Sequence, residues 1–383
     1  MLTEPPLALY LHLPWCLKKC PYCDFNSHRA PAPERRDEQR AAYVDALLQD
    51  LSSQREWVAA RTITTVFIGG GTPSLFTPAE IGRVLEAASA TIGFTPDVEI
   101  TMEANPGAVE HGDFRGYRAA GVNRISIGAQ SFDAATLQRL GRLHGPDDID
   151  TAVRAAQRGG FERLNLDLMH GLPGQSVALA QADIARALAL EVEHLSHYQL
   201  TLEPNTVFYA NPPALPDEES LADIADAAHM ALQSAGFAQY EVSAWCRPGA
   251  ECRHNLNYWR YGDYLGVGAG AHGKLTMTDQ VLRTTRAAHP QSYKESAGRV
   301  PEREEVALVE RPFEYMLNAL RLIDGFHEDE FSARTGCAPA MIAAPLARAK
   351  ERGLVSRIGP GHWSPTLLGR RFLNDLQGFF LTH

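Results

Sequence analysis

Residues 10–27 read Tyr-Leu-His-Leu-Pro-Trp-Cys-Leu-Lys-Lys-Cys-Pro-Tyr-Cys-Asp-Phe-Asn-Ser, with cysteines at positions 16, 20 and 23. An apolar run of strand length, residues 7–13, overlaps the start of this stretch. The cysteines are therefore expected on a loop that leaves the C-terminal end of a strand. Because sites in α/β proteins are built at that end of the strands, the stretch predicts a site carried by an α/β fold.

Three clustered thiolates can bind three irons of a four-iron cluster and leave the fourth iron to a ligand that is not protein. Zinc is the alternative, but a structural zinc site has four ligands, usually in Cys-x2-Cys pairs. The other cysteines are distant and form no such pair: Cys246, Cys252 and Cys337. A disulfide is not expected, because no secretory segment is recognisable. We therefore expect a [4Fe-4S] cluster on three residues: Cys16, Cys20 and Cys23.

The Cys-x3-Cys-x2-Cys spacing, with the aromatic Tyr22 before the third cysteine, resembles the signature of radical S-adenosylmethionine (SAM) proteins. Residues 10–27 as a whole resemble the oxygen-independent coproporphyrinogen III oxidase family, and within it the branch of haem chaperones. The resemblance implies that SAM is a cofactor, chelated through its amino and carboxylate groups to the open iron of the cluster. It also implies that an electron from the cluster cleaves SAM to a 5′-deoxyadenosyl radical.

Composition sets limits on the class of protein. The chain has 383 residues, of which 45% are hydrophobic, enough for two globular domains. No apolar run approaches the roughly 20 residues that a membrane span needs. The first residues, with Glu4 and two prolines, do not resemble a signal peptide. We expect a cytoplasmic protein, with peripheral attachment to a membrane as an alternative. The net charge of −10 argues against a nucleic-acid partner.

Strand-like and helix-like segments alternate through the first 240 residues. The predicted strands are residues 8–13, 64–68, 98–102, 124–127, 164–168 and 195–200. The predicted helices are residues 37–57, 78–90, 112–120, 133–140, 147–158 and 177–189. This alternation predicts a parallel sheet with right-handed crossovers, although periodicity alone leaves barrel closure open. The resemblance implies a partial (β/α)6 radical SAM barrel that is open on one side.

The pattern changes in the last third of the chain. A helix is predicted over residues 217–235, a strand over 240–245, and loops and turns over the glycine-dense residues 262–273. Further helices are predicted over residues 304–323, 329–335, 339–352 and 366–380, with a hairpin of residues 354–358 and 362–364. We expect a barrel over residues 1–240, a connecting segment with the haem-motif loop over 241–300, and a mostly helical, winged-helix-like domain over 301–383.

A glycine run, Gly69 to Gly71, follows the second predicted strand. Glycines let a backbone pass close to a ligand, although a plain turn after a strand is the alternative. Beside the cysteine loop, the run resembles the glycine motif of radical SAM proteins. Glu103 ends the third strand, and a carboxylate there can accept from ribose hydroxyls or an ammonium group. Asp167 lies within an apolar strand, where an unpaired carboxylate would be costly, and Arg142 is one candidate partner. The resemblance implies a SAM-binding set: Tyr10, Tyr22, Gly70, Gly71, Thr72, Glu103, Gln130, Arg142 and Asp167.

A second constellation lies in residues 252–259, Cys-Arg-His-Asn-Leu-Asn-Tyr-Trp. An imidazole suits haem iron and aromatic faces suit the macrocycle, although a histidine among aromatics also occurs as ordinary core packing. The string resembles the His-Asn-x-x-Tyr-Trp motif with which the haem-chaperone branch binds haem. The resemblance implies a haem-binding set: His254, Asn255, Tyr258 and Trp259.

Two departures from the oxidases bear on function. The oxidases carry a fourth cysteine two residues after the third, where this chain has Phe25, and an N-terminal extension where this chain has nine residues before Tyr10. We therefore expect a haem chaperone that delivers haem to acceptor proteins, which include membrane respiratory proteins, and is reduced by a flavodoxin or ferredoxin. Coproporphyrinogen oxidation is not expected, and no catalytic residue is assigned. The oxidase and another radical SAM enzyme, such as a methyltransferase, stay open as alternatives.

Overall fold

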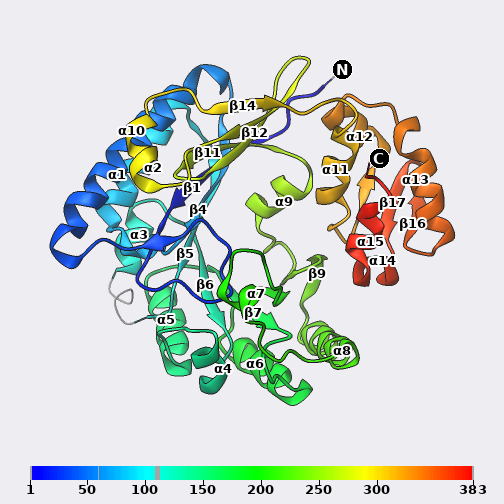
Figure 1. Ribbon diagram of the computed structural model, residues 1–383, viewed down its shortest axis with the longest axis horizontal. Helices are drawn as coiled ribbons and strands as arrows, with labels where there is room; N and C mark the ends of the chain where they lie inside the picture. Colours follow the sequence, from blue (N-terminus) through cyan, green and yellow to red (C-terminus); the bar gives the residue numbers. More distant parts are fainter. Residues whose placement is uncertain (1, 59, 108–112, 382–383) are drawn as a thin grey trace.

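The computed structural model describes residues 2–58, 60–107 and 113–381. Its main feature is a sheet of twelve strands in the order β14-β13-β12-β11-β1-β4-β5-β6-β7-β8-β10-β9 (Figure 1). The run from β11 to β8 is parallel. Its strands are β11 (Asp263–Gly268), β1 (Leu7–Leu13), β4 (Ile63–Gly70), β5 (Phe94–Ala104), β6 (Arg124–Gln130), β7 (Arg163–His170) and β8 (His194–Gln199).

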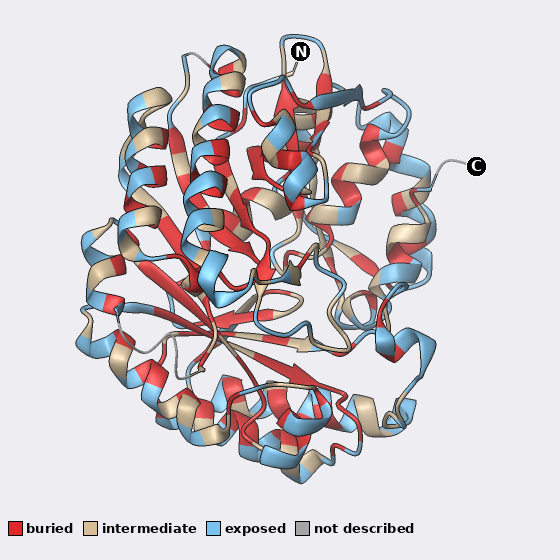
Figure 2. Cartoon of the chain, turned by 60° about the vertical axis from the view of Figure 1, so that its left-hand side comes forward, coloured by how far each residue is buried: buried red, intermediate tan, exposed pale blue. Residues whose placement is uncertain are grey.

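The sheet is curved, and its outer face is covered by helices (Figure 1). Those of the first two thirds are α1 (Pro33–Gln54), α2 (Pro78–Thr91), α3 (Phe114–Ala119), α4 (Ala134–Arg139), α5 (Pro146–Arg158), α6 (Val177–Ala189), α7 (Val207–Ala210) and α8 (Glu218–Ser234). Several start at side-chain caps; Thr77 and Glu80, for example, form a capping box at the start of α2. The parallel strands are almost wholly buried (Figure 2), because apolar side chains on both faces are covered.

The predicted α/β fold with its parallel sheet is confirmed, and all six predicted strands form and lie side by side in the sheet. The predicted first helix begins earlier, at Pro33, and its last residues form a 3-10 turn, Arg55–Val58. The helix predicted over residues 112–120 begins at Phe114, and its first predicted residue lies outside the described ones.

The prediction of loops and turns over residues 262–273 is wrong. That segment forms β11, which lies parallel to β1, and the start of β12 (His272–Thr276), which is followed by β13 (Val281–Thr285) and β14 (Glu302–Glu305). The glycines serve close packing between strands. A Cβ on Gly266 would lie 2.0 Å from the carbonyl oxygen of His272. Gly268 has a φ of +115°, which residues other than glycine rarely adopt. A high glycine content therefore marks crowded strands here, not turns.

The single strand predicted over residues 240–245 is two short ones, β9 (Ala238–Glu241) and β10 (Ala244–Cys246), which pair antiparallel at one edge of the sheet. Strand β10 near one edge and strands β11 to β13 on the other side show that the segment 241–300 extends the sheet in both directions. It also contains α9 (Arg253–Trp259) and α10 (Pro290–Ser296). The division of the chain at residues 240 and 300 stays a prediction.

The C-terminal part contains helices α11 (Arg311–Ala319), α12 (Glu328–Thr335), α13 (Ala340–Glu351), α14 (Leu367–Arg371) and α15 (Leu373–Gly378), and strands β15 (Phe326–His327), β16 (Val355–Gly359) and β17 (His362–Pro365). The predicted hairpin is present, and β15 adds a third strand. The helix predicted from residue 304 begins only at Arg311, because residues 302–305 pair with β13. The last predicted helix is broken at Phe372, which has a non-helical ψ of 47°.

Hydrogen bonds join this C-terminal part to the sheet. The Glu314 carboxylate on α11 accepts from the Tyr261 hydroxyl (2.7 Å) and from the Arg283 guanidinium (2.8 Å). Arg283 also donates to the hydroxyl of Tyr264 on β11 (2.9 Å). None of the helices in the described part of the chain combines the length and apolar character that crossing a bilayer requires.

Candidate functional site

The cysteine loop leaves the C-terminal end of β1, as predicted. Two short strands, β2 (Trp15–Cys16) and β3 (His28–Arg29), pair at its base. Within the loop, the Lys19 ammonium donates to the carbonyl oxygen of Phe25 (3.0 Å), and the Asn26 amide donates to the Ala269 carbonyl beyond β11 (2.9 Å). The loop is thus stabilised both by a hydrogen bond within it and by a hydrogen bond to a segment far away in the sequence.

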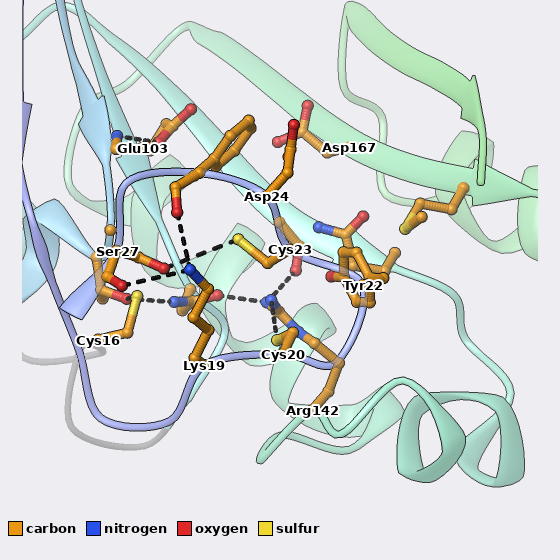
Figure 3. A pocket seen from close by; sticks show the side chains of 18 of the residues that line it. Cys16, Lys19, Cys20, Tyr22, Cys23, Asp24, Ser27, Glu103, Arg142 and Asp167 are labelled. Atoms are coloured by element: carbon orange, nitrogen blue, oxygen red, sulfur yellow. Dashed lines mark hydrogen bonds between the residues drawn. The ribbon is translucent and has the colours of Figure 1, made fainter. Parts of the chain in front are cut away.

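The three cysteines of this loop line a cavity of about 410 Å³ (Figure 3). All three carry free, half-buried thiols. In the described residues, no group of three or more His, Cys, Asp or Glu side chains is gathered closely enough to hold one metal ion. The thiols therefore do not converge as a zinc site requires. A cluster does not require the three sulfurs to meet at one point, because each thiolate binds a different iron.

Polar hydrogens lie close to two of the sulfurs. The Thr72 hydroxyl donates to Cys16 Sγ (3.5 Å), and the Arg142 guanidinium donates to Cys20 Sγ (3.8 Å). Burial raises the pKa of the Cys16 thiol above its ordinary value, against the effect of the Thr72 hydrogen bond. Binding of a cation would therefore release a proton from this thiol.

The glycine motif spans the end of β4, and Gly70 and Gly71 line the same cavity. Gly70 has a φ of +110°, and its amide donates to Glu103 Oε2 (3.1 Å). A Cβ on Gly71 would lie 2.7 Å from the backbone of Pro14, so no larger residue fits between this turn and the start of the cysteine loop. The turn has the exposed backbone that a close-lying polar ligand needs.

Two carboxyl groups face the cavity from β5 and β7. Burial raises the pKa of Glu103 to about 8, with a further contribution from the charge of Asp167, so Glu103 holds a proton at neutral pH. Burial also raises the pKa of Asp167, against hydrogen bonds from Ser126 (2.9 Å) and Asn165 (2.8 Å). A cation bound between these groups would favour the ionised form of both.

The remaining predicted SAM residues divide into two groups. Tyr22, Gln130 and Arg142 line the cavity with the cysteines. Gln130 has a φ of 69° and accepts a hydrogen bond from the Tyr198 hydroxyl (2.8 Å). Tyr10 is the exception, because it is not among the lining residues; its ring stacks on Phe67 and its hydroxyl shares a hydrogen bond with His12 (3.0 Å).

The predicted haem motif lies elsewhere, on the short helix α9 beneath β4. His254 is only 1% exposed, and its Nδ1 is hydrogen-bonded to the Thr65 hydroxyl (3.0 Å). Its Nε2 is buried and has no hydrogen-bond partner among the described residues. Burial lowers its pKa to about 3, so the imidazole is neutral. The nitrogen thus has the chemistry of an iron ligand, but the rings of Phe67 and Tyr258 pack against it.

Sequence reasoning missed several residues of the cavity. Asn105 donates to the Thr72 hydroxyl (2.9 Å) and accepts from Arg142, while Tyr198 holds Gln130. Ser126 and Asn165 hold Asp167. The only sequence signal for Asn105 is its place two residues after Glu103. For the others, the signal is alternation, because they lie on the inward face of predicted strands.

A parallel sheet with a three-cysteine loop and a glycine turn at its C-terminal edge defines a radical SAM protein. The profile of the Radical SAM superfamily matches residues 10–185, and that of the HemN C-terminal domain matches residues 306–372. The solved structure of coproporphyrinogen III oxidase (HemN) from Escherichia coli has the same fold, with a TM-score of 0.81 at 22% identity over 98% of this chain and 90% of that one.

Full-length relatives place the chain more narrowly. It is 46% identical to heme chaperone HemW of Escherichia coli K12 over 100% of both chains. It is 43% identical to heme chaperone HemW of Haemophilus influenzae over 99% of this chain and 98% of that one, and 32% identical to that of Bacillus subtilis over 98% and 99%. The chain belongs to the HemW family.

Proposed function

We propose that this protein is a haem chaperone that binds a [4Fe-4S] cluster and SAM and delivers haem to acceptor proteins. The observation that carries the proposal is the set of three free thiols at a cavity that the glycine turn and two half-buried carboxyl groups also line. The names of the full-length relatives support the delivery of haem. We propose that the protein acts in the cytoplasm, with attachment to a membrane surface as an alternative, and we expect no nucleic-acid partner.

In this proposal each group of the cavity has a separate role. Cys16, Cys20 and Cys23 hold the cluster, which supplies one-electron chemistry when it is bound. The backbone at Gly70 and the carboxyl group of Glu103 bind the polar end of SAM. Asp167, with Gln130, Arg142 and Tyr22, lines the rest of the cavity. A flavodoxin or ferredoxin is proposed as the electron donor.

For haem, we propose the α9 motif as the binding region. Its neutral His254 has an unpaired nitrogen, and the Tyr258 ring packs against it, while the Trp259 ring on the same helix lies under the Arg321 guanidinium. Because His254 is buried, haem reaches it only when the aromatic side chains around it move. Asn255, which precedes Tyr258 on the same helix, is the polar member of the motif.

The cluster is tested by anaerobic reconstitution with iron and sulfide, followed by metal and sulfide analysis and electron paramagnetic resonance. Wild-type protein should bind four irons and four sulfides, and alanine at Cys16, Cys20 or Cys23 should abolish this. Cys337→Ala is the matched control, because Cys337 is buried in the C-terminal part and should leave the cluster intact. One zinc and no sulfide in the wild type would refute the proposal.

SAM binding is tested on the reduced, reconstituted protein by the change that SAM causes in the resonance spectrum of the cluster. Glu103→Gln keeps the size of the side chain but can no longer ionise, so it should weaken SAM binding by roughly 1.5–3 kcal/mol if a charge-assisted contact is lost. An unchanged affinity would assign Glu103 a role other than SAM binding.

Haem delivery is tested by haem titration and by transfer to an apo-acceptor protein. His254→Ala should shift or remove the Soret band, while Tyr258→Ala and Trp259→Ala should only weaken binding. In the same preparation, turnover of coproporphyrinogen with SAM and an electron donor should be absent. Phe25, 58% exposed, occupies the place of the fourth cysteine of the oxidases. Such turnover would overturn the chaperone proposal in favour of the oxidase.

A further inference from the structure

Asn105 directly follows β5 and lies between Thr72 and Arg142, whose side chains donate to Cys16 and Cys20. Its Nδ2 donates to the Thr72 hydroxyl (2.9 Å), and its Oδ1 accepts from Nη2 of Arg142. Thr72 is 3% exposed, so water does not compete for its hydroxyl. The opposite orientation of the amide would turn its NH2 group toward the guanidinium, so the Arg142 contact fixes which way Asn105 faces.

The contact with Asn105 decides where the Thr72 proton points. A hydroxyl has one proton to donate, and the oxygen of Thr72 already accepts the amide proton of Asn105. The hydroxyl proton is therefore free to be donated to Cys16 Sγ, which lies 3.5 Å away. A group that accepted from Thr72 instead would draw this proton away from the sulfur.

The contact with Arg142 fixes a cation beside the second sulfur. Nη2 of Arg142 donates to both Asn105 and the carbonyl oxygen of Gly128 (2.8 Å), which holds the plane of the guanidinium. Nη1 then faces Cys20 Sγ at 3.8 Å. One asparagine thus orients a hydrogen-bond donor onto Cys16 and a cation onto Cys20.

We propose that Asn105 is a positioning residue that, through Thr72 and Arg142, raises the reduction potential of the cluster. This inference rests on the proposed function, because it needs the cluster on the cysteine loop. Reduction adds a negative charge to the cluster and its thiolates, and donors or cations aimed at the sulfurs stabilise that charge. The potential then determines how readily a flavodoxin or ferredoxin reduces the protein.

The test is a redox titration of reconstituted, SAM-free protein, followed by the resonance signal of the reduced cluster. SAM is left out so that no contact of Thr72 or Arg142 with SAM contributes. Asn105→Ala should lower the ratio of reduced to oxidised cluster about tenfold at a fixed ambient potential, which corresponds to about 59 mV for a one-electron couple. Iron and sulfide are measured in every variant so that only loaded protein is compared.

Asn123→Ala is the matched control. Asn123 is also tied to the backbone of β5, through the carbonyl oxygen of Val98 (2.7 Å) and the amide of Ile100 (2.8 Å), but at the opposite end of the strands. The same truncation there should leave the potential unchanged. If Asn105→Ala retains too little iron, Asn105→Leu replaces it: it keeps roughly the size of the side chain and adds no charge, but it can neither donate to Thr72 nor accept from Arg142. It should also lower the potential.

A double-mutant cycle tests whether Asn105 acts through Thr72. Thr72→Val removes the hydroxyl and should itself lower the potential, and Asn105→Ala should then have a smaller effect than it has in the wild type. Full additivity, an unchanged potential in the Asn105 variants, or an equal shift in Asn123→Ala would each overturn the inference. Absence of a cluster from the wild type would instead refute the proposed function.

Discussion

At the scale of single residues, the protonated carboxyl group of Glu103 makes stability depend on pH. Its pKa of about 8 in the folded chain lies above the ordinary value of 4.5. Between these two values the folded state holds a proton that the unfolded state has lost, so wild-type stability should fall as the pH rises from about 5 to 8. Glu103→Gln should remove part of this fall. Urea unfolding of the cluster-free protein at several pH values measures it, and parallel curves for the two proteins would contradict the prediction.

The burial of His254 makes a second residue-scale prediction. Because the imidazole is packed between Phe67 and Tyr258 and bonded to Thr65, His254→Ala should lower the free energy of unfolding by about 2–4 kcal/mol. Asn255→Ala, on the same helix and only half-buried, should cost less than about 1 kcal/mol. Equally small losses of unfolding free energy in the two variants would contradict this prediction and show that the His254 side chain is not tightly packed.

At the scale of elements, the glycines of β11 allow a test of a strand that the sequence analysis did not predict. A Cβ on Gly266 would collide with the backbone of His272, so Gly266→Ala should cost at least about 2 kcal/mol. Gly378→Ala, at the end of α15, meets nothing within 4 Å and should be neutral or stabilising. The two variants are compared by urea unfolding, and a neutral Gly266→Ala would argue against tight pairing of β11 and β12.

The same elements show how far sequence reasoning extends. The six predicted strands carry apolar residues at alternate positions or in short runs, a pattern that can be recognised from the strand's own sequence without knowing its neighbours. In β11 the glycines allow the backbones of β1 and β12 to approach closely. This close approach depends on the neighbouring strands, so the sequence of residues 262–273 alone does not predict it. The helix α9 was predicted as a loop for a similar reason, since its burial depends on β4.

The candidate site divides in the same way. The cysteines and the glycine turn are local motifs, and the structure brings them together because they follow adjacent strands. The role of Asn105 depends on Thr72 and Arg142. These three residues lie after β4, β5 and α4, so no single stretch of sequence predicts that they meet. Tyr10 is predicted to bind SAM from its place in a motif, but the motif does not show that its side chain contacts Phe67 and His12 and does not line the cavity.

At the scale of the whole molecule, the prediction concerns the junction at Glu314. Replacing this carboxylate with glutamine should cost about 1–2 kcal/mol, because charged hydrogen bonds from Arg283 and Tyr261 are weakened at a partly exposed site. Asp45→Asn is the control, since its pair with Arg83 is more than half exposed and should contribute less than about 0.5 kcal/mol. Urea unfolding and hydrogen exchange of α11 measure both, and equal losses would contradict the prediction.

The position of β1 also sets the order of events during synthesis. Leu7 pairs with Asp263 on one side, so one edge of the strand that leads into the cysteine loop stays open until about two thirds of the chain has been made. At typical rates of translation, this interval lasts on the order of tens of seconds. The Asn26 anchor at Ala269 arrives only then as well. An apolar strand with an open edge can recruit other strands, so we expect the cysteine loop to reach its anchored conformation only late in synthesis.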